Sequence, residues 1–79
     1  MEKEIQFLQY VIEHLVDNID AIKIERKEDD MGILLLLEVD KNDIGKVIGK
    51  NGVIIQAVRS LLKIIGAKQG QRINLKIVE

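Results

Sequence analysis

Residues 43–55 read DIGKVIGKNGVII, so three glycines interrupt a run of isoleucines and valines that has helical spacing. The step GKNG at residues 49–52 separates a short apolar segment from a longer one that begins at Val53. A tight turn between two helices needs backbone conformations that glycine adopts freely, and the missing Cβ lets another backbone approach closely. The stretch therefore predicts two helices that meet at a glycine turn.

The chain before this stretch predicts one helix and two strands. Apolar residues recur every three or four positions between Glu2 and about Asn18, which is typical of an amphipathic helix. Residues 22–25 alternate apolar and charged side chains, as a half-buried strand does. A polar turn at residues 28–32 leads into residues 33–39, ILLLLEV, whose apolar run and flanking turn favour a central strand.

The chain from Asp40 onward predicts two helices and a final strand. Asp40 is a typical helix N-cap residue, so a short helix is expected over about residues 41–48. A second helix is expected over about residues 53–65, with Gly66 as its C-terminal stop. Residues 73–77, INLKI, alternate again and predict the last strand. The predicted order is helix, strand, strand, helix, helix, strand, which is an α+β arrangement.

Length and composition exclude several functional classes. The 79 residues suit one small domain, residues 1–79, near the lower size limit for a single hydrophobic core. The chain has no cysteine and a single histidine, His14, which excludes a structural zinc site and cysteine-dependent catalysis. The longest uninterrupted apolar run, residues 33–37, is far too short to span a membrane. We therefore expect a soluble, cytoplasmic protein without catalytic residues, metal or other cofactor.

The two halves of the chain differ sharply in charge, although the net charge is only −1. Residues 1–40 hold four Lys or Arg against eleven Asp or Glu, a balance of −7, and residues 41–79 hold eight against two, a balance of +6. Such segregation can create a local positive field that attracts phosphates. Two independently solvated surfaces would show the same composition, so charge alone leaves both interpretations open.

The GKNG turn combines several features of an anion-binding site. The helix that follows it presents free N–H groups and the positive end of its dipole. Lys50 and Asn51 add a positive charge and hydrogen-bonding groups, while Val47, Ile48 and Ile55 offer apolar walls. A corner between two helices that merely needs glycine would show the same short pattern. The loop alone therefore does not decide between these two interpretations.

A nucleotide-hydrolysing phosphate loop is excluded by its spacing. Residues 45–51, GKVIGKN, have three residues between the glycines where a Walker A loop has four. Asn51 also stands where a Ser or Thr must bind magnesium. No nucleotide or other small-molecule substrate is therefore expected.

Residues 53–65 predict a helix with an unusually wide apolar face. At about 100° per residue, their apolar side chains fill roughly 200° of arc, whereas a one-sided core helix needs a stripe only slightly over about 100° wide. We therefore expect the edge near Ile55 and Leu62 to face a groove or another subunit. The predicted dimer contacts are Ile55, Val58 and Leu62.

Residues 48–55, IGKNGVII, match the I-G-x-x-G-x-x-I signature of KH domains, RNA-binding modules whose G-x-x-G loop clamps a short single-stranded segment. The predicted element order is similar to the type II, bacterial arrangement, which implies a three-stranded mixed sheet with helices on one face. Residues 39–52, VDKNDIGKVIGKNG, look like those of the small stand-alone KhpA (YlqC) family. That family often has proline at the position of Lys41, where this sequence departs from it.

The resemblance implies a set of RNA contacts. In KH domains the loop backbone approaches the sugar-phosphate chain, and the adjoining helices and the neighbouring strand wall the groove. On the strand, Leu36 is the matching position. The implied RNA-binding residues are Gly49, Lys50, Asn51, Gly52, Lys46, Val47, Ile48 and Ile55.

The resemblance also implies partners and a role. The expected ligand is single-stranded RNA, and the expected role is that of an RNA chaperone or post-transcriptional regulator, linked in some bacteria to cell elongation and cell shape. The expected assembly is a homodimer, or a heterodimer with a KhpB (Jag/EloR)-type KH protein. An alternative from another class is a protein-interaction module with a KH fold, in which the helix after the loop forms a dimer seam and RNA binding is secondary.

Overall fold

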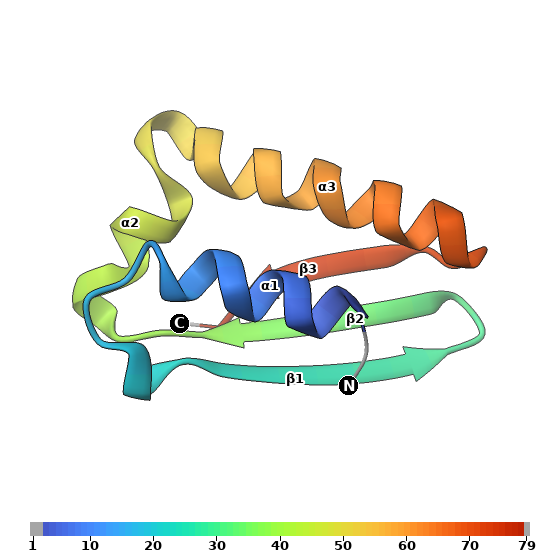
Figure 1. Ribbon diagram of the computed structural model, residues 1–79, viewed down its shortest axis with the longest axis horizontal. Helices are drawn as coiled ribbons and strands as arrows, with labels where there is room; N and C mark the ends of the chain where they lie inside the picture. The colour runs from blue at the N-terminus through green and yellow to red at the C-terminus, as the bar shows by residue number, and fades with distance from the viewer. Residues whose placement is uncertain (1–2, 79) are drawn as a thin grey trace.

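The computed structural model describes residues 3–78, which form a three-stranded sheet with helices on one of its faces (Figure 1). The helices and strands confirm the predicted α+β order. They are α1 (Lys3–Glu13), β1 (Lys23–Asp29), β2 (Gly32–Glu38), α2 (Ile44–Ile48), α3 (Val53–Gln69) and β3 (Ile73–Ile77). Three short 3-10 turns lie between them: η1 (Ile19–Ala21), η2 (Lys41–Asp43) and η3 (Lys50–Gly52).

The sheet is mixed, with β2 as its central strand. β1 pairs with β2 in antiparallel orientation, with Arg26 opposite Leu35, and β3 pairs with β2 in parallel, with Leu75 opposite Leu35. Parallel strands need a crossover connection, and here the crossover carries α2 and α3. The glycine loop therefore belongs to the segment that joins the two parallel strands.

The central strand separates two chemically different faces. Ile33, Leu35 and Leu37 are almost fully buried beneath the helices, whereas Leu34 and Leu36 alternate with them and are only half-buried. Helices cover only one face of the sheet (Figure 1). Because Leu36 alternates with the buried residues of β2, it lies on the face away from α2 and α3. The inference that Leu36 walls a groove beside the glycine loop is therefore wrong.

One hydrophobic core fills the space between the sheet and the helices. Its buried side chains come from α1, α2, α3, β2, β3 and the connecting segments: Leu8, Ile12, Val16, Ile33, Leu35, Leu37, Val39, Val47, Ile55, Val58, Leu62, Ile73 and Leu75. Each long helix buries one face and exposes the other, as amphipathic helices do. Within residues 3–78, no helix has both the length and the apolar character needed to cross a lipid bilayer.

The first helix is shorter than the sequence predicts. The predicted start at Glu2 lies outside the described residues, and α1 ends at Glu13 rather than near Asn18. The segment after it is held by tertiary contacts, because the backbone N–H of Asn18 donates to Asp43 Oδ2 at 3.0 Å and its side chain donates to Asp40 Oδ2 at 3.1 Å. These contacts draw the chain out of the helix and tie it to the start of α2.

The third helix is longer than predicted, because Gly66 does not stop it. α3 continues to Gln69, and Gly70, with a φ of 71°, forms the left-handed C-cap. Gly66 is buried, and a Cβ built there would lie 2.4 Å from the carbonyl oxygen of Gln71. This glycine therefore permits close packing of α3 on the chain that enters β3.

A buried ion pair joins α1 to the edge strand β1. Glu4 is only 1 % exposed, and Arg26 Nε donates to its Oε1 at 2.8 Å while Arg26 also pairs with Glu28. Burial acts to raise the pKa of Glu4, but the hydrogen bond and charge of Arg26, together with hydrogen bonds from its own backbone and from Gln69, outweigh it, so the pKa lies below its ordinary value. The carboxylate therefore stabilises the fold in its charged form.

Acidification should destabilise the protein through this carboxylate. Because the folded-state pKa of Glu4 is depressed, its stabilisation is fully present above the ordinary pKa of a glutamate carboxyl and is lost as the pH falls through the lower folded value. The urea midpoint should therefore fall as the pH is lowered below that ordinary pKa. Glu4→Gln should lower the midpoint at neutral pH and reduce this dependence; an undiminished dependence would contradict the assignment.

Candidate nucleic-acid interface

The backbone of the GKNG loop adopts conformations that its residue types favour. The φ angle is 77° at Gly49, 57° at Asn51 and 76° at Gly52. Glycine adopts positive φ without strain, and asparagine is among the few other residues that tolerate it. Asn51 is the only non-glycine residue with positive φ within the described chain. The order Gly-x-Asn-Gly therefore matches the local geometry at each position that needs it.

The loop is also closely packed and is held by backbone hydrogen bonds. A Cβ placed at Gly49 would lie 2.6 Å from Ile54 Cγ1, so the Ile54 side chain occupies the space that a larger residue would need. The N–H of Gly49 donates to the Gly45 carbonyl at 2.9 Å, and the N–H of Gly52 donates to the Gly49 carbonyl at 3.1 Å. These contacts hold the loop in one conformation before any ligand arrives.

The loop presents the N-terminus of a long helix to solvent. α3 has 17 residues, begins directly after Gly52, and has no side chain capping its first turn. The N–H of Val53 already donates to the Lys50 carbonyl, but the positive end of the helix dipole faces the loop and favours an anion there. Lys50 and Asn51 are exposed at the loop, and neither makes an ion pair or side-chain hydrogen bond within residues 3–78. The arrangement suits an approaching phosphate group.

Lys46 differs from Lys50 because carboxylates already balance its charge. Its Nζ is paired with Asp17 and lies 3.3 Å from Asp43 Oδ1. Hydrogen bonds to these two carboxylates raise the pKa of Lys46. The amide of Asn18 lowers the pKa of Asp43, outweighing the opposing effect of its burial. Lys46 thus belongs to a polar cluster that fixes the start of α2.

The same cluster begins with the predicted N-cap. Asp40 Oδ1 accepts a hydrogen bond from the backbone N–H of Asn42 at 2.9 Å, which confirms Asp40 as the cap of η2. The hydrogen bond from Asn42 also lowers the pKa of Asp40. Because η2 leads directly into α2, these contacts set the direction in which the chain approaches the glycine loop.

The prediction that Val47, Ile48 and Ile55 form apolar walls beside the loop is partly wrong. Val47 is 0 % exposed and Ile55 is 4 % exposed, so their side chains support the loop from the core and offer almost no surface to a ligand. Ile48 is half-buried, as are Ile44 on α2 and Ile54 on α3. The last two are absent from the predicted set, although their helical spacing around the glycines could have indicated them.

The predicted dimer contacts are also buried inside the molecule. Ile55, Val58 and Leu62 face the core at 4 %, 4 % and 0 % exposure, so the expectation that they remain open to a second subunit is wrong. The large apolar side chains that α3 does expose are Val53, Leu61 and Ile64, at 62 %, 47 % and 56 %. The helix is apolar on two sides, as predicted. However, the side that was expected to be open faces the core, and the opposite side is exposed.

The other side of α3 packs against the free edge of β3. Arg59 spans this boundary, because its Nε and Nη2 donate to the Leu75 carbonyl at 3.3 and 3.2 Å. A small cavity of about 170 Å³ lies near the end of β3 and is lined by Glu38, Val39, Lys41, Ile44 and Val78. Arg59 thus joins α3 to β3, a contact between distant segments that the sequence pattern does not reveal.

The family described as "KhpA/KhpB, KH domain" matches residues 5–77. The chain belongs to this family. Its sheet order, its two parallel strands and the helices on one face are those of a type II KH domain. Residues 49–52, GKNG, lie within the range that matches the family.

Proteins named "RNA-binding protein KhpA" resemble this KH domain over most of their length. That of Borreliella burgdorferi is 36 % identical over 76 residues, covering 96 % of this chain and 93 % of its own. That of Chlamydia pneumoniae is 39 % identical over 74 residues, covering 94 % and 95 %. That of Aquifex aeolicus is 39 % identical over 72 residues, covering 91 % of each chain. No solved structure gives a significant match.

Proposed function

We propose that this chain acts as a single, non-catalytic KH domain that binds single-stranded RNA. The observation that carries the proposal is the loop at the start of α3, where an uncapped helix N-terminus lies beside Lys50 and Asn51. Both side chains are free of partners within the described residues. The relatives are named RNA-binding protein KhpA, which supports the same ligand class.

The proposed contacts fall into two groups. The backbone of residues 49–52 approaches the sugar-phosphate chain, and Lys50 supplies the positive charge. The half-buried Ile44, Ile48 and Ile54 supply aliphatic surface for the bases. Lys46 is assigned a positioning role, because Asp17 and Asp43 already neutralise its charge.

Titration of a fluorescent oligonucleotide tests this proposal. A single strand should bind much more tightly than a duplex of the same sequence, because a duplex hides its bases from a narrow apolar site. Since the loop spans about four nucleotides, few counterions are released, and log K against log salt should have a slope of about −2 to −3. Equal binding of the duplex, or a much steeper slope, would favour a broad basic surface instead.

A protein-interaction role is the second candidate, and the exposed apolar row of α3 favours it. Val53, Leu61 and Ile64 lie on one side of the helix together with the exposed Ala57. Apolar rows of this kind usually mark contact surfaces. We propose that two copies pair through this row, as a homodimer or with a KhpB-type KH domain. If the chain acts mainly as a protein-interaction module, RNA binding is secondary to dimerisation.

We base the proposed cellular role of this chain on its membership of the family. A small RNA-binding domain without a catalytic centre suits an RNA chaperone or post-transcriptional regulator in the cytoplasm, with effects on cell shape following from its targets. Crosslinking to cellular RNA followed by sequencing identifies those targets, and a variant with an altered loop provides the background.

A further inference from the structure

One cavity within residues 3–78 lies away from the glycine loop, where the last turns of α3 meet the start of β3. Its volume is about 430 Å³. It is lined by Lys63, Ala67, Gln71, Arg72, Ile73 and Asn74. No acidic side chain lines it, and the exposed Lys63 and Arg72 make no ion pair within the described residues. The cavity therefore combines two available positive charges with an apolar floor.

The backbone around this cavity is firmly held. The N–H of Gln71 donates to the Gly66 carbonyl at 2.9 Å, and α3 packs closely on this segment through Gly66 itself. The carbonyl of Arg72 accepts a hydrogen bond from the N–H of Ile33 at 2.7 Å. Gln71 Nε2 donates a hydrogen bond of 2.7 Å to Oε2 of Glu28, which is not among the residues that line the cavity. The two cations thus project from a rigid rim.

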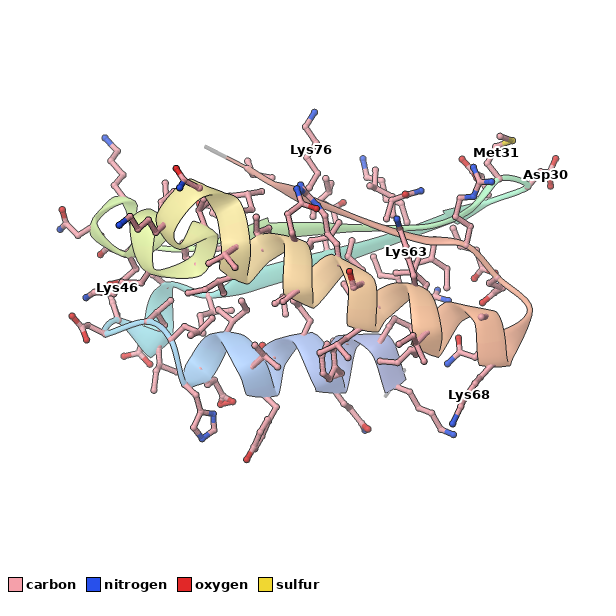
Figure 2. The ribbon with its side chains drawn as sticks, turned by 90° about the horizontal axis from the view of Figure 1, so that it is seen from above. Asp30, Met31, Lys46, Lys63, Lys68 and Lys76 are labelled. Atoms are coloured by element: carbon pink, nitrogen blue, oxygen red, sulfur yellow. The ribbon has the colours of Figure 1, made fainter. Side chains whose placement is uncertain are left out.

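The cavity lies in line with the glycine loop along α3. Lys63 is ten residues after Val53, which places it about 15 Å farther along the helix. Arg59 lies one turn before Lys63 and bonds to β3, so positive side chains follow the same boundary between helix and strand. In Figure 2, Lys63 extends from α3 towards β3, whereas Lys68 points the opposite way. The cavity therefore lies along the boundary between α3 and β3, and the glycine loop lies at the N-terminal end of the same helix.

We propose that this cavity is a second RNA backbone subsite, which receives the strand after it leaves the glycine loop. The inference rests on the proposed function, and it extends the contact surface beyond the about four nucleotides that a G-x-x-G loop clamps. Lys63 and Arg72 each bind a phosphate, with Arg72 able to do so in bidentate fashion. Asn74 offers its amide to a sugar or base. The ligand class is a single-stranded polynucleotide longer than the loop's own segment.

The test compares oligonucleotides of about four and about eight nucleotides on the full chain and on the double variant Lys63→Gln with Arg72→Gln. Wild type should bind the longer strand on the order of tenfold more tightly, and the double variant should lose most of this gain while binding the short strand normally. For the longer strand, the slope of log K against log salt should become shallower by about 1.4, because each phosphate contact to a single strand contributes about 0.7.

The matched control is Lys23→Gln with Lys68→Gln, which removes two exposed charges from β1 and from the opposite side of α3 and should leave the length dependence intact. Circular dichroism should be unchanged in both double variants, since all four side chains are exposed. If wild type binds both oligonucleotides equally, or if the double variant keeps the full gain, the second subsite is disproved. If wild type binds neither oligonucleotide, the proposed function itself fails.

Discussion

Leu62→Glu should unfold the protein, whereas Leu61→Glu, one residue earlier, should leave it folded. Leu62 is 0 % exposed at the centre of the core, and Leu61 is 47 % exposed on the outer side of α3. Removing a buried leucine side chain costs about 2–5 kcal/mol, and burying an unpaired carboxylate adds to this cost. Small proteins have only about 5–15 kcal/mol of stability to lose. Circular dichroism and urea unfolding at neutral pH compare the two variants directly.

The same pair of variants tests the proposed dimer surface. Leu61→Glu places a charge in the exposed apolar row, so sedimentation equilibrium should show a shift from dimer towards monomer while the fold is kept. A folded Leu62→Glu variant would contradict the position of this residue in the core. A wild type that remains monomeric at high micromolar concentration would remove the proposed role of the row.

Replacing Lys50 and Asn51 together with aspartate should nearly abolish RNA binding. Both side chains are exposed, and aspartate tolerates the positive φ at position 51, so the fold should persist. The substitutions place two negative charges where a phosphate must approach the start of α3, which should weaken binding on the order of a hundredfold or more at low salt. Anisotropy titration with a short single-stranded oligonucleotide measures the loss.

A charge-matched control separates this local effect from a general one. Lys23→Asp combined with Gln6→Glu changes the net charge by the same amount at exposed positions on β1 and α1. This control should weaken binding only modestly, because its charges lie away from the loop. Unchanged affinity in the loop variant, with normal circular dichroism, would show that residues 49–52 are not the binding site.

The glycine loop is predictable from the sequence because its requirements fall on single residues. Gly49, Asn51 and Gly52 have positive φ, and glycine and asparagine are the residue types that adopt it most readily. These residue types can be recognised directly in the sequence. The N-cap at Asp40 is predictable for the same reason, since its side chain bonds a backbone amide two residues away. Local geometry of this kind leaves a local signal.

The features that the sequence does not predict depend on contacts between distant segments. Lys46 meets Asp17 across 29 residues, and no local pattern shows that its charge is already balanced. Gly66 resembles a helix stop, yet its role is to admit the backbone of Gln71. The direction in which α3 buries its apolar side chains is likewise set by packing on the sheet, because both sides of the helix are apolar enough to form a core.

The parallel pairing of β2 and β3 links the loop to the way the chain folds. β3 is the last strand and joins β2 only after the whole segment of residues 39–72 has been brought across the sheet. Closing so long a loop is slow, and its entropic cost is repaid only when the non-local contacts form. The glycine loop lies within that segment, and Arg59 ties its helix to the edge strand. The loop should therefore be organised in the same cooperative step that completes the sheet.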